Sequence, residues 1–193
     1  MPDADVIADV SETLRKVLDD ALMDALGIPA VLEDLDASPT ATPARATIFL
    51  YEIVEDSYSR NRARRVTQPS PSDPTVTISK PPMALLLRYL VAPWGGTPRT
   101  KQRIIGQVLQ VLYDGAIVAG MPLQGTLANT DQALKITLAP RTLEELTRIW
   151  WAVQQPYHLS LPYEVRVVNL DVPASTQPRT RPATGSGQQV SGG

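Results

Sequence analysis

The 193-residue chain contains no cysteine and a single histidine, His158. Without cysteine it can form no disulfide, no thiolate metal site and no cysteine nucleophile. With one imidazole we expect neither a catalytic triad nor a histidine-based metal cluster. His158 follows Pro156 and Tyr157 and opens a strand-like stretch, so we predict a partly exposed structural histidine.

Glycine-rich nucleotide-binding motifs are also missing. Gly95 and Gly96 lack the spacing and the lysine of a P-loop, and Gly185 and Gly187 lie in a tail-like segment that opens no Rossmann helix. Several carboxylates have structural explanations as helix caps or as partners of a helix dipole. They are Asp3, Asp5, Asp9, Asp19, Asp20, Glu144 and Glu145. We therefore predict no enzyme, no catalytic residue, no cofactor and no metal site.

Neither charge of one sign nor long apolar runs dominate the sequence. The net charge is −2, which favours neither nucleic acid nor an anionic membrane as a partner. The longest apolar runs, such as residues 83–87, are far too short to span a membrane. The first residues are acidic where a secretory signal would be basic. We predict no membrane insertion and no nucleic-acid partner.

The patterns that are present predict a compact α+β domain. Helices are expected over residues 5–26, 99–113 and 142–155, and strands over residues 47–54, 83–91, 133–138 and 163–168, with a short strand within 28–35. Residues 116–127 are expected to be irregular, with one short apolar segment. We predict a mixed sheet of four to five strands packed with about three helices. Residues 1–171 would form this single domain, and residues 172–193 a disordered tail.

The expected last helix and strand, residues 142–168, form the most clearly patterned unit. Thr142 and Glu145 have the spacing of a capping box, and Pro156 ends the helix. Trp150 falls on the apolar stripe and is predicted to be core, whereas Trp151 points about a quarter turn away. Trp151 would either cover a sheet edge or contact a partner.

Residues 55–82 form a long loop rich in arginine and proline, with a short strand-like stretch at 75–79. It carries Arg60, Arg62, Arg64 and Arg65. A loop of this length inside a compact domain is usually functional or disordered. Three interpretations stay open: a charged protein interface, a solvated loop, and a nucleic-acid contact. The acidic net charge and the lack of accompanying aromatics disfavour the last.

Four stretches, in their order and spacing, resemble one family. They are residues 82–90 (PMALLLRYL), 104–114 (IIGQVLQVLYD), 143–150 (LEELTRIW), and 155–160 (QPYHLS) leading into 163–168 (YEVRVV). Together they resemble the cap, or tail-terminator, proteins of phage-tail-like contractile injection systems. The resemblance covers about residues 5–170.

The resemblance implies a structural role. Such a protein would form a ring, expected to be a hexamer, on the distal end of the inner tube and sheath, end their polymerisation and hold the last sheath layer. Its partners would be its own copies, the sheath protein and the inner tube protein, with no cofactor. It would assemble in the cytoplasm as part of a particle that can be released. The alternative is a non-enzymatic adaptor or baseplate-associated binding module of the same particle. Arg60, Arg62, Arg64, Arg65 and Trp151 are the candidate interface residues.

Overall fold

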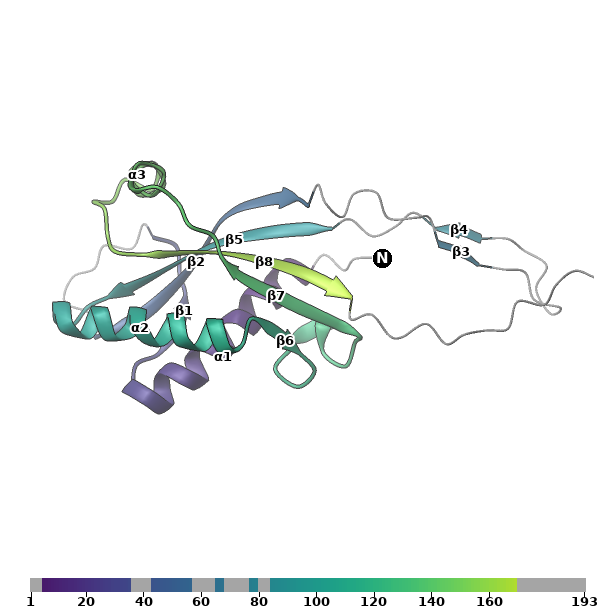
Figure 1. The fold of residues 1–193 in the computed structure, drawn as a ribbon, viewed down its shortest axis with the longest axis horizontal. Coiled ribbons are helices and arrows are strands. Elements are labelled where there is room, and N and C mark those ends of the chain that lie inside the picture. Colours follow the sequence, from purple (N-terminus) through teal and green to yellow (C-terminus); the bar gives the residue numbers. More distant parts are fainter. Residues whose placement is uncertain (1–4, 36–42, 57–64, 68–76, 80–83, 170–193) are drawn as a thin grey trace, which may run out of the picture.

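A computed structural model describes residues 5–35, 43–56, 65–67, 77–79 and 84–169 of the chain (Figure 1). Its elements, in order, are α1 (Val6–Leu26), β1 (Ala30–Leu32), β2 (Arg45–Glu55), β3 (Arg65–Thr67), β4 (Thr77–Ser79), β5 (Leu85–Trp94), α2 (Pro98–Asp114), β6 (Ile117–Ala119), the 3-10 helix η1 (Gly125–Leu127), β7 (Gln132–Leu138), α3 (Leu143–Ala152) and β8 (Leu161–Asn169). The predicted tail, residues 172–193, lies outside the described residues.

The main sheet has six strands in the order β1-β2-β5-β8-β7-β6. β1 pairs with β2 in parallel, and every other neighbouring pair in this sheet is antiparallel. The α+β class and the mixed sheet are thus confirmed, but the prediction of four to five strands was short by β6. This three-residue strand lies in the stretch predicted to be irregular. It is defined by its pairing with β7, and three residues are too few to show a period of their own.

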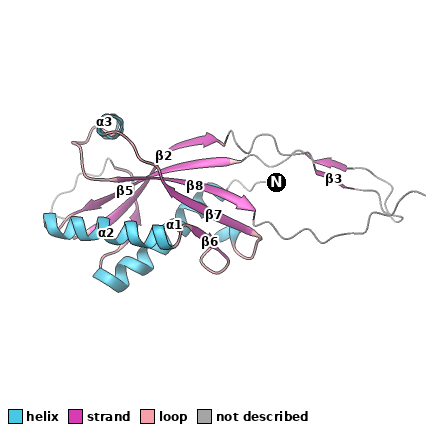
Figure 2. Ribbon diagram, viewed as in Figure 1, coloured by secondary structure: helices cyan, strands magenta, loops and turns pink. Residues whose placement is uncertain are grey.

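The helices lie on both faces of the sheet (Figure 2). α1 and α2 cover one face and form the larger core, which includes Leu14, Leu18, Val108 and Tyr163. The Tyr89 hydroxyl joins the two layers through a 2.8 Å hydrogen bond with the Ser11 hydroxyl, and its burial raises the pKa of Tyr89 to about 12.

α3 packs on the opposite face and forms a smaller core. The buried members of this second cluster are Leu35, Leu90, Ala92, Trp94, Leu146 and Trp150. Figure 1 shows α3 on the side of the sheet away from α1 and α2. α3 therefore covers only part of this face of the sheet, and polar side chains lie on the rest of the same face.

The α1 helix begins and ends where predicted, but its N-terminus is not capped by a side chain. Gly27 follows it in the left-handed region at φ 66° and donates its N–H to the Met23 carbonyl. Asp5 occupies the N-cap position, yet its side chain makes no capping hydrogen bond. Asp9, one turn later, instead accepts hydrogen bonds from the Thr126 N–H at 2.8 Å and the Thr126 hydroxyl at 2.6 Å. The acidic side chain thus attaches α1 to η1 and not to its own first turn.

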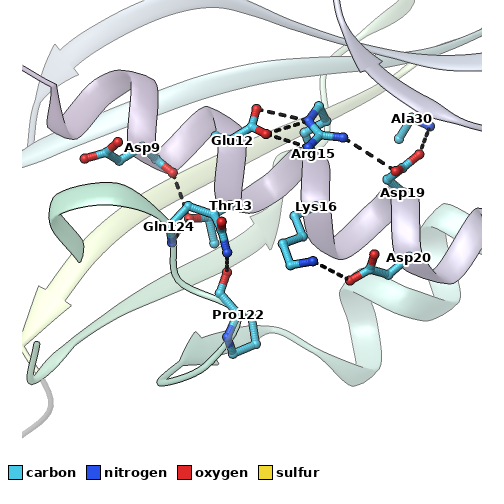
Figure 3. A network of polar contacts seen from close by, with 10 residues as sticks. All are labelled: Asp9, Glu12, Thr13, Arg15, Lys16, Asp19, Asp20, Ala30, Pro122 and Gln124. Carbon is cyan, nitrogen blue, oxygen red and sulfur yellow. Dashed lines mark hydrogen bonds and ion pairs between the residues drawn. The ribbon is translucent and has the colours of Figure 1, made fainter. Parts of the chain in front are cut away.

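Thr13 and Asp19 of α1 also attach the helix to other segments (Figure 3). The Thr13 hydroxyl donates to the Asp9 carbonyl and accepts the Gln124 N–H at 3.0 Å. Asp19 accepts the Ala30 N–H at 2.9 Å, which positions the first residue of β1. Asp9 and Asp19 therefore have structural contacts, but these are with Thr126 and Ala30 and are not the helix caps or dipole interactions that were predicted.

β5 is the central strand, and it is longer than expected. Its ladder with β2 continues through the pairs Ala46–Pro93 and Arg45–Trp94, so the prediction that the strand ends before Pro93 was wrong. Proline has no N–H to donate to a ladder and belongs where a strand has one neighbour. The pairing of β5 with β8 stops at Val91, so Pro93 lies in just such a place.

Candidate assembly interface

α3 forms from a complete local signal. The Thr142 hydroxyl accepts the Glu145 N–H at 3.2 Å, and a Glu145 carboxylate oxygen accepts the Thr142 N–H at 2.8 Å. This is the predicted capping box, and the hydrogen bonds from Thr142 hold the pKa of Glu145 below its usual value. The helix ends at Ala152, ahead of Pro156. The local sequence therefore fixes the orientation of the two tryptophans.

The adjacent tryptophans have opposite environments. Trp150 is fully buried, and its indole N–H donates to the Ser160 hydroxyl at 3.2 Å. It meets the Trp94 ring edge-on at a centroid distance of 5.9 Å. Trp151 is 80% exposed, so it is not used to cover a sheet edge of its own chain. The prediction that Trp150 is core is confirmed, and the prediction that Trp151 contacts a partner stays a prediction.

His158 belongs to the same cluster. Its ring lies 4.5 Å from the Trp94 ring and 5.1 Å from the Trp150 ring, centroid to centroid, and the residue is half-buried. It is a partly exposed packing residue, as predicted. Burial, with a smaller contribution from the positive charge of Lys101, lowers the pKa of His158.

This pKa shift predicts a specific loss of stability in mild acid. The unfolded chain takes up the His158 proton at a higher pH than the folded chain, so the free energy of unfolding falls as the pH drops below about 6.5. The fall stops once the folded-state ring is also protonated. Glu12 and Glu145, whose pKa values are lowered mainly by hydrogen bonds from Arg15 and Thr142, reduce stability only below the ordinary glutamate value of 4.5. Denaturant unfolding followed at several pH values would resolve the two windows.

His158→Phe is the matched variant for this experiment. It keeps an aromatic ring beside Trp94 and Trp150 but has no titrating group, so the loss of stability that begins below about pH 6.5 is expected to disappear. A variant with the same slope as the wild type in this window would assign the slope to another group.

The predicted arginine interface lies mostly beyond the described residues. Arg60, Arg62 and Arg64 fall outside them. Arg65 begins β3, which pairs with β4 in a separate two-stranded sheet, with Arg65 opposite Ser79. The placement of Arg65 in a short strand was not predicted, whereas β4 lies within the strand-like stretch predicted at residues 75–79. The structure thus places one of the four arginines, and it does not bring that residue together with Trp151.

A band of paired charges on the α3 face of the sheet was not predicted. Glu164 of β8 accepts a hydrogen bond from Arg88 Nε of β5 at 3.0 Å, and Arg88 also donates to Glu52 of β2 at 2.6 Å. Arg141 and Arg166 approach the Glu164 oxygens within 3.8 Å. The hydrogen bond to Glu52, followed by that to Glu164, raises the pKa of Arg88 against the opposing effect of burial. We name Glu52, Arg88, Arg141, Glu164 and Arg166 the charged band.

One feature of β2 brings Glu52 into this band. The register with β5 shifts between Leu50 and Glu52, so that Glu52 lies opposite Arg88. Arg88 shares its face of β5 with Leu90, because strand residues two apart point the same way. The bulge therefore turns Glu52 toward the α3 face, although unbroken alternation would have placed it on the other. The sequence contains a weak indication of the charged band, because Arg88 interrupts an apolar run and Glu164 and Arg166 alternate with apolar neighbours.

Within the described ranges, no three carboxylate or imidazole side chains are placed to hold a metal ion. No helix of this part of the chain combines the length and the hydropathy needed to cross a membrane. What the described surface offers is exposed apolar side chains, paired charges and sheet edges.

Comparisons with known proteins identify one matching family and two solved structures of similar fold. A family model described as the Pvc16 N-terminal domain matches residues 9–183. The fold is similar to a solved structure described as the sheath/tube terminator of PVC, an extracellular contractile injection system, in the extended state. The two chains are 23% identical with a TM-score of 0.57, and the match covers 97% of this chain and 65% of that one. The fold is also similar to the anti-feeding prophage cap, a tube terminating cap, with 19% identity, a TM-score of 0.55, and coverage of 98% and 62%. The chain therefore spans less than two thirds of either protein. No curated protein matches it.

Proposed function

The chain belongs to the Pvc16 N-terminal domain family, and we propose that it is a non-enzymatic cap that terminates the tail of a contractile injection system. Several copies, six in our proposal, form a ring on the distal end of the inner tube and sheath. The ring stops both from growing and holds the last sheath layer to the tube. The observation that carries this proposal is the similarity of nearly the whole chain to the folds of a sheath/tube terminator and a tube-terminating cap.

The surface of the chain suits such a role. A closed ring of identical subunits needs two different surfaces that meet head to tail. The described chain exposes apolar side chains in more than one region, among them Trp151 and Tyr113, which are 80% and 84% exposed. Where exposed apolar side chains form a contiguous patch, they mark an interaction surface. We assign the contacts with tube or sheath to Arg60, Arg62, Arg64 and Arg65, which would face acidic surface, and we assign Trp151 to the contact between copies in the ring.

Deletion of the chain from cells that build the particle tests the proposal. We expect tubes and sheaths of irregular length that lack the distal ring, because nothing would block further addition of subunits. Electron microscopy of purified particles would measure the length distribution, and expression of the intact chain from a plasmid would restore it. Particles of normal length with normal distal ends in the deletion strain would refute the proposal.

The position of the chain separates the cap from the alternative adaptor. A small tag on the chain, visualised with a gold-labelled binder, is expected at the end of the particle opposite the baseplate. A label at the baseplate end would instead favour a baseplate-associated binding module. The same particles, isolated from the cytoplasm and from the medium, would show whether assembly precedes release.

A further inference from the structure

An apolar groove lies between the C-terminal half of α2 and the strand edge formed by β6 and β7. Its volume is about 600 Å³, and its lining includes Leu109, Tyr113, Ile117 and Leu138. The lining also includes four consecutive residues, 135–138. Successive strand residues point to opposite faces, so a hollow that contacts all four reaches the open edge of β7. Its contact with Tyr163 of β8 shows that it also extends onto the face that α2 covers.

The groove exists because β6 is shorter than β7. β6 pairs only with the first part of β7, and its last contact is the hydrogen bond from the Ile136 N–H to the Ala116 carbonyl at 2.8 Å. The residues before Ala116 belong to the end of α2 and not to a strand. The outer edge of β7 near Leu138 therefore has no neighbouring strand within the described part of the chain. Tyr113 is 84% exposed at the rim and Ile117 62%. An open strand edge beside exposed apolar groups is suited to a protein contact.

A second exposed apolar region lies on α3. Trp151 is 80% exposed and Leu143, at the other end of the helix, 65%. Glu144 and Arg148 precede Trp151 by seven and three positions, so all three project from one side of the helix. The Glu144 and Arg148 side chains are 75% and 77% exposed and pair with each other. α3 lies across the sheet from α2, so the two apolar regions are on separate surfaces (Figure 1).

We propose that the groove of one copy receives the α3 surface of the next copy, with the Trp151 indole inserted between α2 and the edge of β7. This inference rests on the proposed ring. Two non-overlapping apolar surfaces on one chain are what a head-to-tail interface requires. The charges also fit, because exposed Lys135 lines the groove and exposed Asp114 follows the lining residue Tyr113 at the end of α2, whereas Glu144 and Arg148 of the incoming helix carry the opposite signs. A buried tryptophan surrounded by polar contacts is a common energetic centre of interfaces.

Cysteine crosslinking in assembled particles tests this contact. The chain has no natural cysteine, so introduced thiols are its only ones. Arg148→Cys combined with Asp114→Cys leaves Trp151 and the apolar groove intact. After treatment of isolated particles with a short bis-maleimide, we expect a ladder of covalent multimers of this chain on a denaturing gel. Each single-cysteine variant is expected to lose the ladder, since a head-to-tail interface pairs unlike positions.

Two matched variants complete the experiment. Arg148→Cys with Met23→Cys, on α1 away from the groove, is expected to give no ladder. Addition of Trp151→Ala to the Arg148 and Asp114 pair is expected to abolish the ladder. The second charge pair, Glu144→Cys with Lys135→Cys, repeats the test should the first pair fail to enter particles.

The outcomes distinguish the contact from the function. Normally terminated particles that contain the paired cysteines but give no ladder would overturn this interface and leave the capping function standing. Crosslinks from Asp114→Cys to a sheath or tube protein would also overturn it, because the groove would then hold a different partner. Failure of the capping function itself would appear in the deletion strain, independently of any cysteine.

Discussion

Replacement of Trp150 with alanine is expected to lower the free energy of unfolding by about 3–5 kcal/mol. The side chain is fully buried and lies at the centre of the core that holds α3 to the sheet. Its removal leaves a cavity between Trp94 and His158, and the Ser160 hydroxyl loses the indole N–H that it accepts. Urea unfolding of the purified chain, monitored by circular dichroism, would measure the change.

Trp151→Ala is the matched control one position along the same helix. Because Trp151 is 80% exposed, its replacement is expected to change the free energy of unfolding by no more than about 0.5 kcal/mol. It should instead reduce incorporation of the chain into particles. Equal unfolding midpoints for the two variants would contradict the assignment of Trp150 to the core, and wild-type incorporation of Trp151→Ala would remove Trp151 from the interface.

The contrast between these neighbours shows what the sequence alone can predict. Helical periodicity separates Trp150 from Trp151, and the Thr142–Glu145 capping box fixes where the helix starts. Both signals are local, so the predicted core position and helix start are confirmed. The α+β class followed from similar local patterns in α1, α2 and the longer strands.

The features that could not be predicted depend on contacts between distant segments. β6 exists because Val118 lies opposite Leu134, and the bulge after Leu50 exists because of the register with β5. Neither leaves a periodic pattern in the sequence. The groove beside β7 and the charged band follow from these two features, and so both were missed. The arginine cluster was conspicuous in the sequence, yet its first three members lie outside the described residues.

Glu164→Gln is expected to lower the free energy of unfolding by about 2 kcal/mol. Its side chain is 20% exposed and lies among Arg88, Arg141 and Arg166, so the loss of its charge removes the carboxylate that these three guanidinium groups share. Each arginine keeps one other carboxylate partner, namely Glu52, Glu145 and Asp56 respectively. Partial solvent exposure keeps the effect below that of a fully buried pair. Thermal and urea unfolding would measure it. The control is Glu144→Gln, which removes an ion pair that is 75% exposed and should cost less than about 0.5 kcal/mol.

A double-mutant cycle would show whether the charged band acts as a unit. Arg88 also pairs with Glu52, so Arg88→Gln alone leaves two carboxylates without a shared cation. When Arg88→Gln and Glu164→Gln are combined, both charges of the pair are removed together, so neither is left behind without the other. We therefore expect the double variant to be less destabilised than the sum of the two single variants, by about 1 kcal/mol. Strictly additive losses would mean that Arg88 and Glu164 stabilise the sheet independently. Coupling would show that paired charges hold β2, β5 and β8 together on the part of this face that α3 leaves uncovered.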